Sequence, residues 1–240
     1  GISDAEIRGK METLLAEARQ KLQEHPANLV WHRRLLQLLL LRGDAAGARQ
    51  AHEAFGRAVR AESPDDPQQL AVYSLASLHT LEGRAAEGLA QARLLKDKSA
   101  SHLAQFAAQI ELGNLVEAEK LVPEKDAGHP ALLLHVAWLV RGDAAKANGW
   151  REKAIQAYAQ GPEPARSIAR QLEKGEKIEA KDIEDFQAPP IGKVPTLIAL
   201  AAACPAQREP LLALAEKLNY DTYFPQRFLQ RAIAAVRKMK

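Results

Sequence analysis

The sequence predicts an all-α protein whose helices pair and stack into a solenoid, and two observations lead to this prediction. First, one short phrase recurs four times: a helix end, a glycine followed by a polar residue, and a small residue five places after the glycine. The glycines are Gly43, Gly83, Gly113 and Gly142, and their spacings of 40, 30 and 29 residues are typical of helical repeats. Second, alanine and leucine carry the apolar content and β-branched residues are few, which favours helix nearly throughout.

Each part of the recurring phrase has a physical role. A glycine at a helix end adopts the left-handed conformation that stops the helix, and the polar residue after it caps the next helix. The small residue lies inside that second helix and lets two antiparallel helices approach closely. These small residues are Ala48, Gly88, Ala118 and Ala147. One helix pair cannot bury its apolar stripes alone, so we expect the pairs to stack on one another.

Caps and breakers along the chain predict the individual helices. Prolines end helices at residues 25–26, 63–67 and 161–164, and they recur in the first turn of the later helices. The predicted helices span residues 3–24, 28–42, 44–62, 67–82, 84–96, 99–112, 115–123, 129–141, 143–160, 164–174, 195–203, 205–218 and 225–238, with a short charged helix at 181–186. Residues 188–192 form the predicted linker. This division gives helical repeats over residues 1–160, a charged helix and proline-rich linker over 161–192, and a helical cap over 193–240.

The spacing within the phrases resembles that of the tetratricopeptide repeat (TPR), which places alanine at plus five and plus twelve from the glycine. The fourth unit fits at Gly142, Ala147 and Ala154, whereas Phe55 and Lys125 replace the second alanine in the first and third units. The resemblance covers about residues 9–160. It implies a right-handed α-α superhelix, a TPR-like solenoid, with a helical C-terminal cap. A generic α-α solenoid is the alternative.

The resemblance also implies a function, because proteins of this architecture mostly serve as scaffolds for protein–protein interaction. Their first helices line a concave groove that holds an extended or helical segment of a partner. The matching positions here are Arg33, Gln37, Tyr73, Ser77, Thr80, Leu103, Ala107, Leu132 and Val136. Tyr73 is the best single anchor, since tyrosine combines apolar area with a hydroxyl group. Only Arg33 is cationic at the positions where some members clamp a C-terminal carboxylate, which argues against chaperone-tail binding.

The charge pattern disfavours the other classes of partner. The 33 basic and 30 acidic side chains are mixed along the chain and leave a net charge of +3. That balance predicts no nucleic-acid partner, and the isoelectric point near 9.0 is the only support for one. No apolar run reaches the roughly 18 residues of a membrane span, so no membrane insertion is expected. In the final helix, the basic residues Arg237, Lys238 and Lys240 lie at the C-terminus, where they offset the helix dipole. Arg227 and Arg231 form a stripe that alternatively contacts an anionic partner.

The motifs of enzymes and metal sites are not found in the sequence. The seven histidines have no metal-ligand spacing, and no phosphate-binding loop, dinucleotide-binding glycine motif or nucleophile elbow occurs. Cys204 is the only cysteine and is expected to be a small buried thiol. His79 is expected to be a packing residue, and His135 is expected to be a groove or packing residue and not a metal ligand. The acidic residues 179–185 lack the pattern of a calcium loop. We therefore expect no catalysis, no cofactor and no bound metal.

The chain begins Gly-Ile-Ser-Asp without an initiator methionine, so we expect it to be a piece of a longer protein whose targeting signal does not show. One alternative function follows from this, namely an accessory solenoid arm of a larger enzyme or of a membrane-anchored assembly protein. A helical-repeat nucleic-acid binder is a weaker alternative. Partner identity, compartment and oligomeric state are left open by the sequence.

Overall fold

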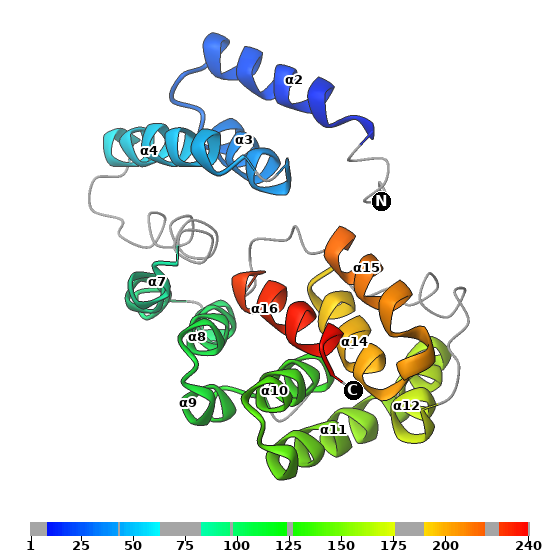
Figure 1. The fold of residues 1–240 in the computed structure, drawn as a ribbon. Helices are drawn as coiled ribbons and strands as arrows, with labels where there is room; N and C mark the ends of the chain where they lie inside the picture. The colour runs from blue at the N-terminus through cyan, green and yellow to red at the C-terminus, as the bar shows by residue number, and fades with distance from the viewer. Residues whose placement is uncertain are drawn as a thin grey trace. The chain divides into compact units, whose positions relative to one another are not determined.

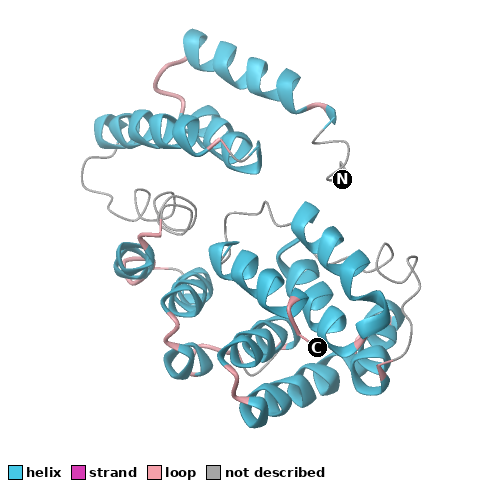
Figure 2. Ribbon diagram, viewed as in Figure 1, coloured by secondary structure: helices cyan, strands magenta, loops and turns pink. Residues whose placement is uncertain are grey.

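The computed structural model describes residues 9–42, 44–62, 83–96, 98–123, 127–175, 190–218 and 226–239 (Figure 1). Within these ranges the regular structure consists of twelve α-helices and one 3-10 helix, with no strand (Figure 2). The prediction of an all-α protein is therefore confirmed for the described residues. None of the helices described is both long enough and apolar enough to cross a membrane.

The chain divides into two units. Unit 1 comprises residues 1–105 and 220–224, and unit 2 comprises residues 106–219 and 225–240. The domain ends predicted at residues 160 and 192 both fall inside unit 2. The reason is that the helices following them pack on the helices before them: α12 (Glu163–Lys174) contacts α11 (Ala144–Ala159), and α14 (Pro190–Ala203) contacts α10 (Gly128–Arg141).

Unit 1 contains α2 (Met11–Glu24), α3 (Leu29–Arg42), α4 (Ala45–Glu62), α7 (Ala85–Ala92) and the first part of α8 (Lys98–Leu112). Helix α3 packs against both α2 and α4. The core of these three helices includes Leu15, Leu36 and Ala48, which are all nearly or fully buried. Asn28 caps α3 as expected, because its side-chain Oδ1 accepts the Val30 backbone N–H at 3.0 Å.

Unit 2 is built around α10. Its other elements are the end of α8, α9 (Leu115–Glu119), α11, α12, α14, a 3-10 turn (Pro205–Gln207), α15 (Arg208–Leu218) and α16 (Gln226–Arg237). Helix α10 packs against α9, α11, α14 and α16. As a result, every residue of α10 from Ala131 to Trp138 is buried.

The predicted turns have the expected backbone conformation wherever they are described. Gly83, Gly113 and Gly142 have φ values of 75°, 74° and 84°, which lie in the left-handed region. Gly43 lies outside the described residues. In three of the repeats, the residue that follows the glycine donates its backbone N–H to a carbonyl five positions earlier, as in a Schellman motif. These bonds are Asp44 N to Leu39 O (3.0 Å), Asn114 N to Gln109 O (2.9 Å) and Asp143 N to Trp138 O (3.1 Å).

The small residue five places after each glycine is buried in all four repeats. Ala48, Ala118 and Ala147 are 0%, 0% and 1% exposed, and Gly88 is buried as well. In the α10–α11 pair the close approach has a direct marker, because the His135 Nδ1–H of α10 donates to the backbone carbonyl of Ala147 in α11 at 2.8 Å. The prediction that Ala147 lies where these two helices meet is therefore confirmed.

The prediction of a linker at residues 188–192 is wrong for residues 190–192, which are helical. Helix α14 begins at Pro190, not at Pro195, so Gly192 is helical and Pro195 lies inside the helix. Pro190 suits a first helical position because that position needs no N–H donor. A Cβ at Gly192 would come within 2.6 Å of the His129 ring, so this glycine permits close packing of α14 on the start of α10.

Candidate functional site

The structure describes only some of the residues predicted to line a concave groove. Arg33 lies exposed on α3, and Leu103 is 46% exposed on α8. Four predicted residues fall outside the described part of the chain: Tyr73, Ser77, Thr80 and the side chain of Gln37. A role for Arg33 and Leu103 in partner binding stays a prediction.

Two of the predicted groove residues require a correction. Leu132 and Val136 are both 0% exposed, and the neighbouring groove position Ala107 is 5% exposed. Side chains this deeply buried offer no surface to a partner. The face of α10 that carries Leu132 and Val136 is covered because α14 and α16 pack against that helix, a contact that the repeat pattern does not encode.

The structure instead has a groove between α9 and α11, in unit 2. Its volume is about 830 Å³. The walls are Glu119, Val122 and Pro123 on one side and Trp150, Lys153, Gln156 and Gln160 on the other. We call this feature the α9–α11 groove.

The α9–α11 groove exists because its two helices differ in length. Helix α9 has five residues and α11 has sixteen, so α9 covers only part of its neighbour. The sequence predicts a helix as far as residue 123, but the structure ends it at Glu119. The backbone then turns, with Leu121 N donating to Ala118 O at 3.0 Å. Pro123 explains the early end, since a proline disfavours helical geometry in the residue before it.

One carboxylate in the wall of this groove joins three helices, α9, α10 and α11. Glu119 Oε1 accepts the indole N–H of Trp138 at 2.8 Å and the indole N–H of Trp150 at 2.9 Å. Trp138 comes from α10 and is 5% exposed, whereas Trp150 comes from α11 and is half-buried. Hydrogen bonds to a charged acceptor are stronger than neutral ones, so this pair holds the carboxylate in a defined position.

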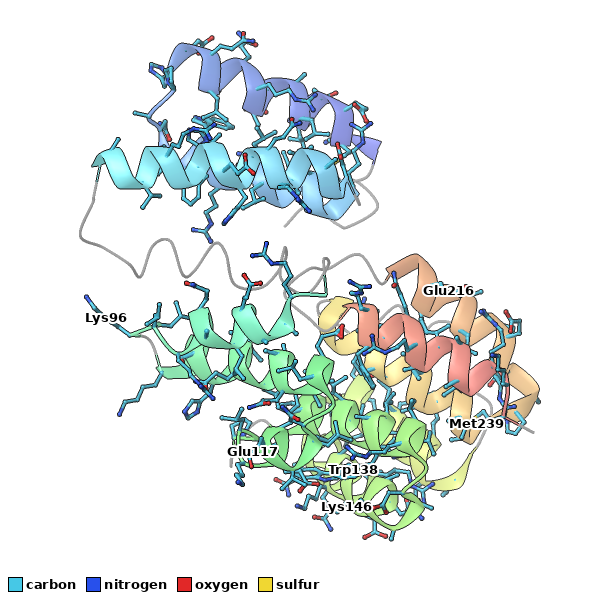
Figure 3. The ribbon with its side chains drawn as sticks, turned by 60° about the vertical axis from the view of Figure 1, so that its left-hand side comes forward. Lys96, Glu117, Trp138, Lys146, Glu216 and Met239 are labelled. Carbon is cyan, nitrogen blue, oxygen red and sulfur yellow. The ribbon has the colours of Figure 1, made fainter. Side chains whose placement is uncertain are left out.

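Lysine side chains of α11 cover the two indole rings. Lys146 Nζ lies 3.9 Å from the centre of the Trp138 ring, and Lys153 Nζ lies 3.9 Å from that of Trp150. Figure 3 shows Trp138 and Lys146 side by side. Both are cation–π contacts, in which the ammonium group is attracted to the negative face of the ring. Sequence reasoning missed this cluster, and the available signal was the Trp150–Lys153 spacing of one helical turn.

A second polar cluster lies at the junction of α10, α11 and α14. The Tyr158 hydroxyl is hydrogen bonded to His129 Nδ1 at 2.6 Å, and Thr196 also bonds to Tyr158. Burial raises the pKa of Tyr158 and lowers the pKa of His129. Gly128 and Gly192 make room for the two rings. The cluster joins three helices, and we interpret it as structural.

The prediction for Cys204 is confirmed, and His135 takes the packing role, one of the two that the sequence leaves open for it. His135 is 5% exposed and is held by its bond to the Ala147 carbonyl, and burial lowers its pKa. Cys204 is 4% exposed, and burial raises the pKa of its thiol. His79 and the acidic residues 179–185 lie outside the described residues. Among the residues that are described, no group of three or more His, Cys, Asp or Glu could hold a metal ion.

The basic stripe of α16 makes contacts within its own unit. The Glu111 side chain of α8 is 3% exposed, and its Oε1 accepts the backbone N–H of Phe228 at 2.7 Å at the start of α16. Its Oε2 lies 3.3 Å from Arg231 Nη2. Arg237, in the last turn, pairs with Glu209 and Glu216 of α15 at 2.8 and 2.9 Å. Arg231 thus has an acidic partner within unit 2, and the contact of the Arg227–Arg231 stripe with an anionic partner stays a prediction.

Comparison with protein-family models, with curated proteins and with solved structures gives no match for this chain. Its function has to be inferred from the geometry of its own residues.

Proposed function

We propose that this protein is a TPR-like helical scaffold that binds a segment of another protein, and that unit 2 binds this segment in the α9–α11 groove. The recurring turns support the TPR-like assignment, since Gly113 and Gly142 share one backbone conformation and are each followed by the same Schellman bond. The observation that carries the binding proposal is the groove itself, with an anchored carboxylate and a half-buried tryptophan in its walls.

The chemistry of the α9–α11 groove suits a peptide. Gln156 of α11 and Gln160, the residue that caps its C-terminus, are exposed, lie four positions apart and line the same wall. A side-chain amide both donates and accepts hydrogen bonds, so it matches the N–H and C=O groups of an extended backbone. Trp150 supplies apolar area, and tryptophan is among the residues that most often dominate binding energy at interfaces.

The groove volume and lining favour binding over catalysis. Its volume of about 830 Å³ falls within the range of ligand sites, which is roughly 300–1,000 Å³. The described residues that line it include no histidine, cysteine, serine or threonine that could act as a nucleophile beside a base. Protein–protein interaction is therefore the function that this geometry supports best.

Selection from a random-peptide library on the immobilised protein tests the proposal. We expect Trp150→Ala to weaken the selected peptides by about 2 kcal/mol or more, roughly thirtyfold in Kd, because it removes a central aromatic anchor. Gln156→Ala is expected to weaken them less while leaving the Trp150–Glu119 bond in place. Val116→Ala is the matched control, since Val116 is 51% exposed on α9 and does not line the groove.

Thermal unfolding of each variant separates lost binding from lost folding. If the selected peptides bind the folded Trp150→Ala and Gln156→Ala variants as tightly as the original chain, the α9–α11 groove is not the site.

A further inference from the structure

We infer that the α9–α11 groove recognises a protein segment by one basic side chain, arginine or lysine, which pairs with the second carboxylate oxygen of Glu119. This inference rests on the proposed function and adds the chemistry of the partner. It starts from a carboxylate that is held in place by the protein yet left without a cation of its own.

Among the described residues, only one oxygen of Glu119 has a hydrogen-bond partner. Oε1 accepts both indole N–H groups, and Oε2 has no hydrogen-bond or ion-pair partner among the described residues. Several basic groups of the surrounding helices have other partners: Lys146 and Lys153 lie on the tryptophan rings, and Lys120 pairs with Glu117 at 2.7 Å. Arg141 donates to the Gly113 carbonyl. Glu119 therefore presents a carboxylate oxygen that has no salt-bridge partner among the described residues, in the wall of the groove.

The two indole bonds also prepare Glu119 for binding. A flexible surface carboxylate loses side-chain entropy when it pairs, which is one reason that exposed ion pairs are weak. Glu117 and Lys120 form such a pair on the same short helix, with side chains 53% and 64% exposed. Glu119 is already restrained by Trp138 and Trp150, so an incoming cation does not have to order it.

The surroundings of Glu119 favour a basic side chain over a small cation. Lysine and arginine carry apolar stems that pack along aromatic surface while the charged end reaches a carboxylate. Trp150 lines the groove beside Glu119 and supplies that surface. Arginine fits best, because its planar guanidinium stacks on a ring and donates hydrogen bonds in the same plane.

The groove also limits how much positive charge it accepts. Lys153 lines the wall opposite Glu119 and places a positive charge within the same groove. A run of basic residues would bring like charges together beside Lys153, which is unfavourable. We therefore expect preference for one isolated basic residue within an otherwise uncharged segment, not for a polybasic tract.

The three tryptophans provide a direct readout by nuclear magnetic resonance. The chain has one indole N–H signal each from Trp31, Trp138 and Trp150, and Trp31 lies in unit 1, outside the groove. The probes are four capped peptides: Leu-Arg-Leu, Leu-Gln-Leu, Leu-Glu-Leu and a tri-arginine peptide. We expect saturable shifts of the Trp138 and Trp150 signals with Leu-Arg-Leu, no shift of Trp31, and clearly weaker effects with the other three peptides.

A matched pair of variants assigns the effect to Glu119. Glu119→Gln keeps a side-chain oxygen for the indole N–H groups but removes the charge, and we expect it to lower the affinity for Leu-Arg-Leu about three- to tenfold. Glu117→Gln removes an equal charge two residues away and should leave that affinity unchanged. The dispersed indole signals of each variant report that it is folded.

The possible results separate this inference from the function on which it rests. If Leu-Gln-Leu shifts the two signals as strongly as Leu-Arg-Leu, or if Glu119→Gln binds Leu-Arg-Leu normally, the basic-residue subsite is overturned while binding of segments in the groove stands. If none of the four peptides moves Trp138 or Trp150, the subsite is also overturned. Only the library selection with Trp150→Ala decides the proposed function itself.

Discussion

The α3–α4 pair of unit 1 and the α10–α11 pair of unit 2 share one local design. In both, the aspartate after the glycine turn caps the second helix: Asp44 Oδ1 accepts the Gly47 N–H at 2.8 Å, and Asp143 Oδ1 accepts the Lys146 N–H at 3.0 Å. In both, the small residue five places after the glycine, Ala48 or Ala147, is buried. The two pairs therefore share the aspartate cap, the buried small residue and the backbone bond that the aspartate donates to a carbonyl five positions earlier.

The two pairs differ in what covers the first helix. Every residue of α10 from Ala131 to Trp138 is buried, because α14 and α16 pack on it in addition to α11. Helix α3 packs on α2 and α4, and it exposes Arg33 and Val30, the latter by 69%. A repeat phrase thus specifies a helix pair, whereas the exposure of its first helix depends on distant parts of the chain.

The largest expected effect concerns the buried face of α10. Leu132→Ala should lower the free energy of unfolding by about 2–5 kcal/mol, because it leaves a cavity in a fully buried position. Leu103→Ala, at a position that is 46% exposed, should change it by only about 0.5 kcal/mol. Urea unfolding of both variants measures the difference. Equal, small effects would show that α10 is open, as the repeat pattern alone predicts.

A smaller effect is expected at the contact within each pair. Ala147→Leu and Ala48→Leu should each cost about 1–3 kcal/mol, because a larger side chain forces the paired helices apart. Ala145→Leu and Ala46→Leu place the same side chain at exposed positions of the same helices and serve as controls. Melting temperatures compare the four variants. If Ala147→Leu melts together with Ala145→Leu, the small residue does not set the spacing of α10 and α11.

The pH dependence of stability should also distinguish α10 from α3, because α10 carries two histidines whose pKa values are lowered by burial. Burial lowers the pKa of His129 and His135, so on acidification the unfolded state takes up these protons before the folded state does. The two histidines therefore stabilise unit 2 fully above a pH of about 6.5, and this stability is lost as the pH falls from there to their lowered folded pKa values. Each unit by which a histidine pKa is lowered on folding corresponds to about 1.4 kcal/mol in the free energy of unfolding.

A substitution isolates this effect from other titrating groups. Glu111 opposes it, because burial raises its pKa and the folded state then takes up that proton first as the pH falls. His135→Gln keeps an N–H donor for the Ala147 carbonyl but does not titrate, so urea unfolding at neutral and mildly acidic pH should show a shallower dependence. His25→Gln, at an exposed position after α2, is the control. An unchanged pH dependence in His135→Gln would exclude His135 as a source.

The features that the sequence predicted well are those with local causes. The conformation of Gly142, the cap at Asp143 and the burial of Ala147 depend on a few neighbouring residues, and each was predicted correctly. The start of α14 was predicted wrongly, because the close approach of Gly192 to His129 depends on packing between helices far apart in the chain. The local sequence around Pro190 and Gly192 is compatible both with a linker and with a tightly packed helix.

The candidate site was missed for the same physical reason. Glu119 lies 19 residues before Trp138 and 31 residues before Trp150, so their convergence requires α9, α10 and α11 to be packed. The predicted groove residues Leu132 and Val136 failed because the helices that cover them come much later in the chain. Repeat spacing contains no information about either contact.

The bond between Glu111 and the start of α16 has a consequence for the order in which the protein is made. The Phe228 N–H that Glu111 accepts comes from a residue synthesised 117 positions later. Until α16 leaves the ribosome, this carboxylate has no helix start to cap, and the apolar face of α10 lacks one of its covers. Unit 2 therefore completes its fold only after α16 has been synthesised, and until then part of the apolar surface of α10 lacks its cover.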